Sequence, residues 1–178
     1  MERPRQGTIH PERRIRHSGT TGNGTHITID ASGDFSEAAK DGEVQAFLLT
    51  DVHSSHRVIA CARDTTCNSL LNMVKQYIAH TRYAPDTLSL RSIHTDNAFM
   101  AAPLRDFCKE KGIKLTSCAP HTYQGNAVSE TTVKMVKRVV RRNKHQANTW
   151  SKLRAYCWVY SGVQLNRTPS STDPTGSF

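Results

Sequence analysis

The sequence predicts an α/β domain in which helices cover one mixed sheet of five strands. Two observations predict this class. Three apolar, strand-like segments follow one another early in the chain with no helical pattern between them, and from residue 64 onward helical and strand patterns alternate. Strands joined directly pair as an antiparallel meander, whereas an intervening helix allows parallel pairing. We therefore expect a sheet that is antiparallel in its first part and mixed as a whole.

The five expected strands are short segments bounded by polar or turn-forming residues. They are 25–30 (THITID), 44–52 (VQAFLLTDV), 56–62 (HRVIACA), 87–96 (TLSLRSIHTD) and 113–119 (IKLTSCA). The first alternates apolar and polar residues, as a half-buried strand does, and the second is apolar enough for a central strand. The polar stretch 31–43 between them is expected to be a loop.

Four segments have helical patterns, and their ends carry start or stop signals. They are 64–80, 102–112, 128–144 and 149–166. In the first, Asp64 or Thr65 can cap the N-terminus, and the apolar residues from Leu70 to Ile78 fall on one face. Pro85 breaks the chain after it, and Gly112 closes the second helix. These signals predict separate helices rather than one long one.

The chain is long enough for one domain with its own core. Residues 1–24 are basic and contain HSGTTGNG, which is too rich in Gly, Ser and Thr for a packed element, so a flexible arm is expected there. The predicted domain spans residues 25–172, and residues 173–178 form a tail. No run of eighteen or more apolar residues occurs, and the N-terminus lacks the apolar region of a secretory signal. We therefore expect no membrane association.

The charge balance and the cysteines narrow the possible functions. The formal net charge is +9, which favours a polyanionic partner such as nucleic acid over a generic basic protein. The five cysteines are an odd number without regular spacing, which argues against a disulfide framework and for a reducing compartment. Cys61 and Cys67 with His53 and His56 fit no familiar zinc spacing.

Three acidic residues stand out by position: Asp30 and Asp96 end predicted strands, and Glu130 begins the long basic helix. Ligands of such sheets gather at strand ends, so the three carboxylates can share one site. Carboxylates suit Mg²⁺ or Mn²⁺, and two such ions about 3.5–4 Å apart catalyse in-line phosphoryl transfer. Taken singly, each acid also has an ordinary explanation, because aspartates form turns and a helix dipole favours an acid in its first turn.

The long helix carries cations on and beside the face of its acid. Lys134 and Lys137 follow Glu130 at helical spacing and share its face. Arg138 and Arg141 belong to a run of positive charge that extends to Lys144. These side chains can hold nucleic-acid phosphates beside metal ions, although a solvated cationic face or a nuclear-import patch explains such a run equally well.

Several segments together resemble one protein family. SIHTDNAF (92–99) resembles the second-aspartate motif of retroviral-type integrases, and GIKLTSCAPHTYQGNAVSE (112–130) resembles the pattern that leads to the family's glutamate. THITIDASGDF resembles the first-aspartate strand. LNRTPSS (165–171) is similar to a motif after the core helices of copia-type retrotransposon integrases. The resemblance covers about residues 25–172 and favours the copia type over retroviruses or bacterial transposases.

This resemblance implies an RNase H-like fold and a catalytic, metal-binding triad of Asp30, Asp96 and Glu130 that holds two Mg²⁺ or Mn²⁺ ions. It implies 3′-end processing and transfer of element DNA into target DNA. It also implies a homodimer or higher oligomer, and a location in the nucleus or, before import, in a cytoplasmic virus-like particle. The DNA contacts that it suggests are Gln124 and Asn126 in the loop before the triad glutamate, and Lys134 and Lys137 on the helix. Arg138 and Arg141 are candidate DNA contacts from the run of positive charge alone.

The sequence also departs from the family pattern. Ala98 and Ala127 stand where the family has glycine, and Tyr123 replaces a proline. No His/Cys zinc module or C-terminal DNA-binding region is recognised, so we expect a catalytic core and not a complete integrase. The departures leave two alternatives open. One is a catalytically inactive or domesticated RNase H-like DNA-binding module, and the other is a ribonuclease H or bacterial transposase on the same fold.

Overall fold

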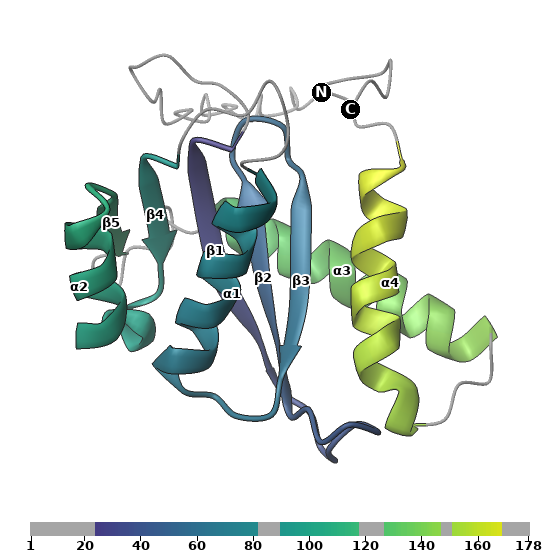
Figure 1. The fold of residues 1–178 in the computed structure, drawn as a ribbon. Helices are drawn as coiled ribbons and strands as arrows, with labels where there is room; N and C mark the ends of the chain where they lie inside the picture. Colours follow the sequence, from purple (N-terminus) through teal and green to yellow (C-terminus); the bar gives the residue numbers. More distant parts are fainter. Residues whose placement is uncertain (1–23, 82–89, 118–126, 147–150, 169–178) are drawn as a thin grey trace, which may run out of the picture.

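The computed structural model describes residues 24–81, 90–117, 127–146 and 151–168. These residues form one five-stranded sheet with helices on both faces (Figure 1). The strands are β1 (His26–Asp34), β2 (Gln45–Asp51), β3 (Arg57–Ala62), β4 (Ser92–Thr95) and β5 (Lys114–Ser117), in the spatial order β3-β2-β1-β4-β5. β1, β2 and β3 pair antiparallel, whereas β4 pairs parallel with β1 and with β5. The expected mixed sheet is confirmed.

The four expected helices are present, with two short 3₁₀ turns between them. The helices are α1 (Cys67–Thr81), α2 (Ala102–Glu110), α3 (Ala127–Gln146) and α4 (Arg154–Asn166), and the turns are η1 (Asn97–Phe99) and η2 (Ser151–Leu153). α1 and α2 cover one face of the sheet, α3 crosses the other, and α4 lies beside β3 (Figure 1). None of the helices in the described ranges is both long and apolar enough to cross a membrane.

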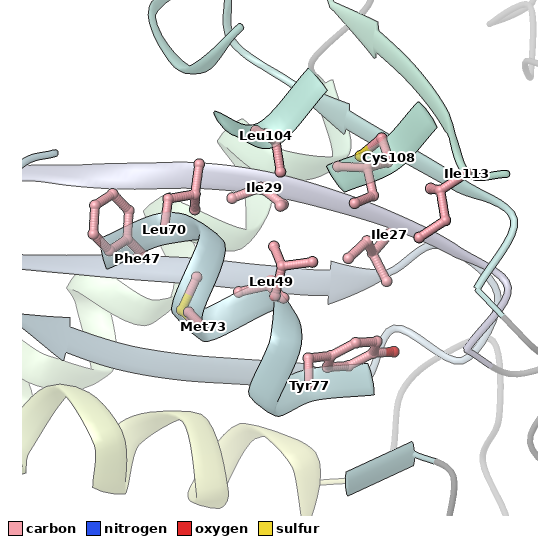
Figure 2. Packing of buried hydrophobic residues seen from close by; sticks show 12 residues of the cluster. Ile27, Ile29, Phe47, Leu49, Leu70, Met73, Tyr77, Leu104, Cys108 and Ile113 are labelled. Carbon is pink, nitrogen blue, oxygen red and sulfur yellow. The ribbon is translucent and has the colours of Figure 1, made fainter. Parts of the chain in front are cut away.

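Side-chain alternation along β2 explains how both faces acquire a core. Phe47 and Leu49 join the cluster under α1 and α2, and Figure 2 shows them packed with Leu70 of α1 and Leu104 near α2's start. Their neighbours on the strand, such as Leu48, point to the opposite face and pack with residues of α3 and α4. The continuous apolar run of the sequence is therefore a strand buried on both sides.

The first strand is longer than the sequence indicated. β1 continues through Asp30 to Asp34, because Asp30 and Ala31 still pair with Leu48 and Phe47 of β2. A register irregularity follows before Asp34 pairs with β2 again. The prediction that Asp30 ends the strand, and that a loop starts at residue 31, is wrong; Asp30 lies inside the strand.

The start of α1 also differs from the prediction. The Thr66 hydroxyl accepts a hydrogen bond from the Ser69 backbone N–H at 3.4 Å, so Thr66 is the cap rather than Asp64 or Thr65. Asp64 acts one step earlier, because its carboxylate accepts bonds from both the N–H and the hydroxyl of Thr66. At the end of α2, Gly112 has a φ of +66°, which confirms its predicted role as the helix stop. The turn at Pro85 lies outside the described residues.

Candidate active site

Strand register brings the two aspartates together. β1 and β4 run parallel with Ile29 opposite Thr95, so the residues that follow these two, Asp30 within β1 and Asp96 just after β4, lie at the same level of the sheet. Since Ile27 and Ile29 face the α1 side, Asp30 points to the face that α3 covers. Asp96 stands just after β4, and its carboxylate accepts the Asn97 N–H at 2.6 Å as the cap of η1.

Glu130 reaches the same place from the first turn of α3. The helix packs on β1 and β2 through buried residues that include Ser129, Val133 and Val136, and this packing fixes where its first turn lies. Glu130 is half-buried at the edge of that contact. Each carboxylate therefore comes from a different chain segment: Asp30 from the interior of a strand, Asp96 from the end of a strand and Glu130 from the start of a helix.

The pKa of Asp30 depends on the charged groups near it. Burial is the main cause that raises the pKa of Asp30 above its ordinary value, and the negative charges of Asp96 and Glu130 raise it further. The Ala31 N–H, which donates to Asp30 at 2.7 Å, and the positive charge of Lys137 lower this pKa. The structure thus brings the three predicted acids and one predicted lysine within electrostatic reach of each other.

The predicted cations of α3 divide between two directions. Lys134 lies 3.8 Å from the Glu130 carboxylate, and its side chain is 78% exposed. Lys137 is half-buried near Asp30, and exposed Arg141 extends the same helical stripe by one more turn. Exposed Arg138 lies to the side of that stripe. The predicted DNA contacts Gln124 and Asn126 lie outside the described residues.

The donor chemistry of the three acids fits a hard divalent cation. Apart from one local backbone bond to each aspartate and the Lys134 contact, no hydrogen-bond or ion-pair partner of these carboxylates is found in the described part of the chain. Oxygen ligands of this kind suit Mg²⁺ or Mn²⁺. Nevertheless, within residues 24–81, 90–117, 127–146 and 151–168 no three His, Cys, Asp or Glu side chains lie close enough to share one metal ion.

A buried polar layer under the site was not identified from the sequence. Thr28 and Thr50 stand opposite each other on β1 and β2, and both are buried, as is Ser129 of α3. Their hydroxyls have no hydrogen-bond partner in the part of the chain that the structure describes. The signal for this layer was the alternation of Thr28 with two isoleucines, which puts a polar residue on the Asp30 face.

Comparisons with known proteins identify solved structures that share this architecture. No protein-family model matches the sequence, and no curated protein matches it. Solved structures do match. The catalytic core domain of BIV integrase aligns with a TM-score of 0.63 at 17% identity, over 86% of this chain and 91% of that one. The HTLV-2 integrase catalytic core domain, solved with magnesium in a trimeric form, aligns with a TM-score of 0.64 at 15% identity, over 86% and 93%.

A third match is a chain of the simian T-cell lymphotropic virus intasome, in a complex with the PP2A regulatory subunit B56 gamma. It has a TM-score of 0.70 at 14% identity, and this protein covers 54% of that chain. The chain has the fold of a retroviral integrase catalytic core. The expected RNase H-like fold is therefore confirmed, and this chain spans about half the length of the intasome chain.

Proposed function

We propose that this chain is the catalytic core of a copia-type retrotransposon integrase, which processes the 3′ ends of element DNA and joins them to target DNA. The observation that carries the proposal is that Asp96 and Glu130 act electrostatically on Asp30 within an integrase-like fold. The motif at 165–171 supports the copia type. The expected DNA partners, self-association, and nuclear or particle location are part of this proposal.

In this proposal the three carboxylates hold Mg²⁺ or Mn²⁺. Such ions, when bound, activate the attacking oxygen and neutralise charge that develops on the phosphate. Asp30 carries its negative charge against burial and against two like charges, so it gains most from a neutralising cation. Lys137, Lys134 and Arg141 lie along the adjoining face of α3, where they can hold the phosphates of the DNA strand.

A second candidate is a DNA-binding module that has lost catalysis. Two observations favour it: in the described ranges the acids do not form a closed metal-binding group, and Glu130 faces Lys134. Like charges repel, so an acid that already has a cationic neighbour gains less from a metal ion. The two candidates share the fold and differ in whether the acids act together.

The deciding experiment uses a branched DNA that mimics the strand-transfer product, with Mn²⁺ and then Mg²⁺. Its reacting ends are already positioned, so a core can resolve it without flanking domains. We expect wild type to resolve the branch, and Asp96→Asn and Glu130→Gln to abolish this activity. Asp106→Asn and Glu110→Gln, at exposed positions on α2, are matched controls and should remain active.

The other possible results of the branched-DNA experiment would each support a different function. A folded wild type that binds the branched DNA without resolving it would replace the integrase proposal by the inactive module. Activity that survives both Asp96→Asn and Glu130→Gln would remove these acids from the mechanism. Cleavage of an RNA–DNA hybrid in place of the branch would indicate a ribonuclease H.

A further inference from the structure

A hollow of about 450 Å³ lies between the edge strand β3 and the end of α4. Four of the side chains that line it are aliphatic: Val58 and Ile59 on the strand, and Val159 and Val163 on the helix. The two helix valines are 44% and 41% exposed. A recess with apolar walls and a few polar groups is the usual form of a ligand site, and the aliphatic walls suit an apolar side chain.

The polar groups of this hollow are mostly basic. His56, Arg57 and Arg167 line it, and no acidic residue is among its lining residues. Neither arginine takes part in an ion pair within the part of the chain that the structure describes. The hollow therefore offers positive charge that the described residues do not neutralise, and it favours an anionic ligand.

Arg57 gives the most specific indication of that anion. Its guanidinium is partly buried, and burial lowers the pKa of Arg57 because the charged form loses solvation. The Nε atom is buried and has no hydrogen-bond partner among the described residues. A buried donor without an acceptor is costly, and a carboxylate oxygen would satisfy it with a charge-assisted hydrogen bond.

The main chain of β3 also presents hydrogen-bonding groups at this hollow. The N–H and C=O of Arg57 point away from β2, because both bond to the Asn166 side chain. Orientation alternates along an antiparallel strand, so the N–H and C=O of Ile59 point outward as well. Within the described ranges these two groups have no hydrogen-bond partner. An extended peptide can add there as a short strand, which ends where Asn166 closes the edge.

We propose that this hollow binds a short extended peptide that carries a carboxylate next to an aliphatic residue. The peptide main chain bonds to Ile59, and its aliphatic side chain lies against Val159 and Val163. Its carboxylate meets Arg57 and Arg167.

Other occupants would leave part of the hollow unused. A nucleic-acid strand would use the basic side chains but not the aliphatic walls. A small inorganic anion would use neither the walls nor the main-chain groups of Ile59. The inference does not depend on catalysis, because no residue that lines the hollow belongs to the acidic site.

The first test measures binding of a fluorescein-labelled Gly-Ser-Thr-Val-Glu peptide with a free C-terminus, by fluorescence anisotropy on the full chain. One control peptide has lysine for glutamate and an amidated C-terminus, and the other has serine for valine. Arg57→Gln should weaken binding about tenfold or more, because it removes a charged hydrogen bond. Arg105→Gln is the matched control, since Arg105 is an exposed cation on α2, and it should bind as wild type does.

Circular dichroism shows that each variant is folded. A folded wild type that does not bind the peptide would overturn the proposal. Equal binding of the control peptides, or equal weakening by both variants, would overturn it too, because the contact would then be non-specific attraction to a basic protein.

The second test addresses strand addition. Bound peptide should slow hydrogen exchange of the Ile59 N–H severalfold, as NMR can measure, and unchanged exchange would mean that no strand adds to β3. If a short DNA duplex displaces the peptide, and Arg57→Gln weakens duplex binding as much, the hollow belongs to the DNA surface and the peptide proposal is wrong. Loss of branched-DNA activity with intact peptide binding would affect the proposed function alone.

Discussion

Asn166 joins the end of α4 to the edge of the sheet through a single residue of β3. Its side-chain oxygen accepts the Arg57 N–H at 2.9 Å, and its amide nitrogen donates to the Arg57 carbonyl at 2.7 Å. The amide thus satisfies both backbone groups that a neighbouring strand would otherwise bind. Asn166→Asp keeps the acceptor but replaces the donor by a second oxygen that faces the carbonyl.

The size of the effect follows from these two bonds. A neutral hydrogen bond contributes about 0.5–1.5 kcal/mol, so Asn166→Ala, which loses both, should cost about 1–3 kcal/mol. Asn166→Asp at pH 7 should cost a similar amount, because the carbonyl loses its donor and meets a negative charge. In a chain of this length each kcal/mol lowers Tm by about 2–4 °C.

The pH dependence makes the prediction specific. A protonated carboxyl at position 166 can donate to the Arg57 carbonyl, so folding favours the protonated form and raises the pKa of the introduced group. Lost stability should therefore return as the pH falls through that raised pKa, and disappear again as the pH rises through it. Thermal unfolding from pH 4 to 8 measures this against wild type at each pH.

Asn72→Asp, at an exposed position on α1, is the control and should show no such recovery. Equal stability of Asn166→Asp and wild type at pH 7 would mean that the Asn166 amide does not stabilise the end of α4. A stability deficit that shrinks at low pH no more than that of Asn72→Asp would contradict the predicted pKa of the introduced carboxyl.

Three further predictions concern single side chains. Because the pKa of Asp30 is raised in the folded chain, wild-type stability falls as the pH rises through that pKa. Asp30→Asn should therefore raise Tm at pH 7 in the presence of a chelator, and a lower Tm would contradict this. Gly162→Ala brings a Cβ to 3.0 Å from the Ile59 side chain. The crowding should cost about 1–3 kcal/mol against a gain in helix propensity of about 1 kcal/mol, so urea unfolding should show a net loss of stability. A gain in stability would mean that the Ile59 side chain turns aside. Burial raises the pKa of the Cys61 thiol to about 12. Iodoacetamide at pH 8 should therefore alkylate Cys61 far more slowly in the folded chain than in urea, which peptide mass mapping can measure. Equal rates of alkylation would contradict the burial of this thiol.

The sequence predicted elements whose signal is local and strong. The apolar run at 44–52 indicated a central strand, and β2 is buried on both faces. The long helix was predicted at 128–144 and extends from Ala127 to Gln146, because its apolar residues recur at helical spacing over many turns. Gly112 was recognised as a stop because a positive φ favours glycine.

Features set by pairing between distant segments could not be predicted. The polar residues after Asp30 resemble a loop, and only their register with β2 keeps them in a strand. The position of Lys137 near Asp30 depends on how α3 crosses the sheet, which the sequence of α3 does not encode alone. In the same way, the helical pattern of α4 predicted a helix but not which side would face solvent. The roles of the site residues, including Gln124 and Asn126, stay predictions.

The position of β1 between an antiparallel and a parallel neighbour has a consequence for folding. β1 pairs with β2 across a short stretch of chain, but with β4 only after the whole of β2, β3 and α1 has intervened. Contacts between distant segments form more slowly than local ones. On a ribosome, the three-stranded meander can therefore emerge with the β4 side of β1 still unpaired. An unpaired edge is where strands from other chains can add, so we expect delayed synthesis of β4 to increase aggregation.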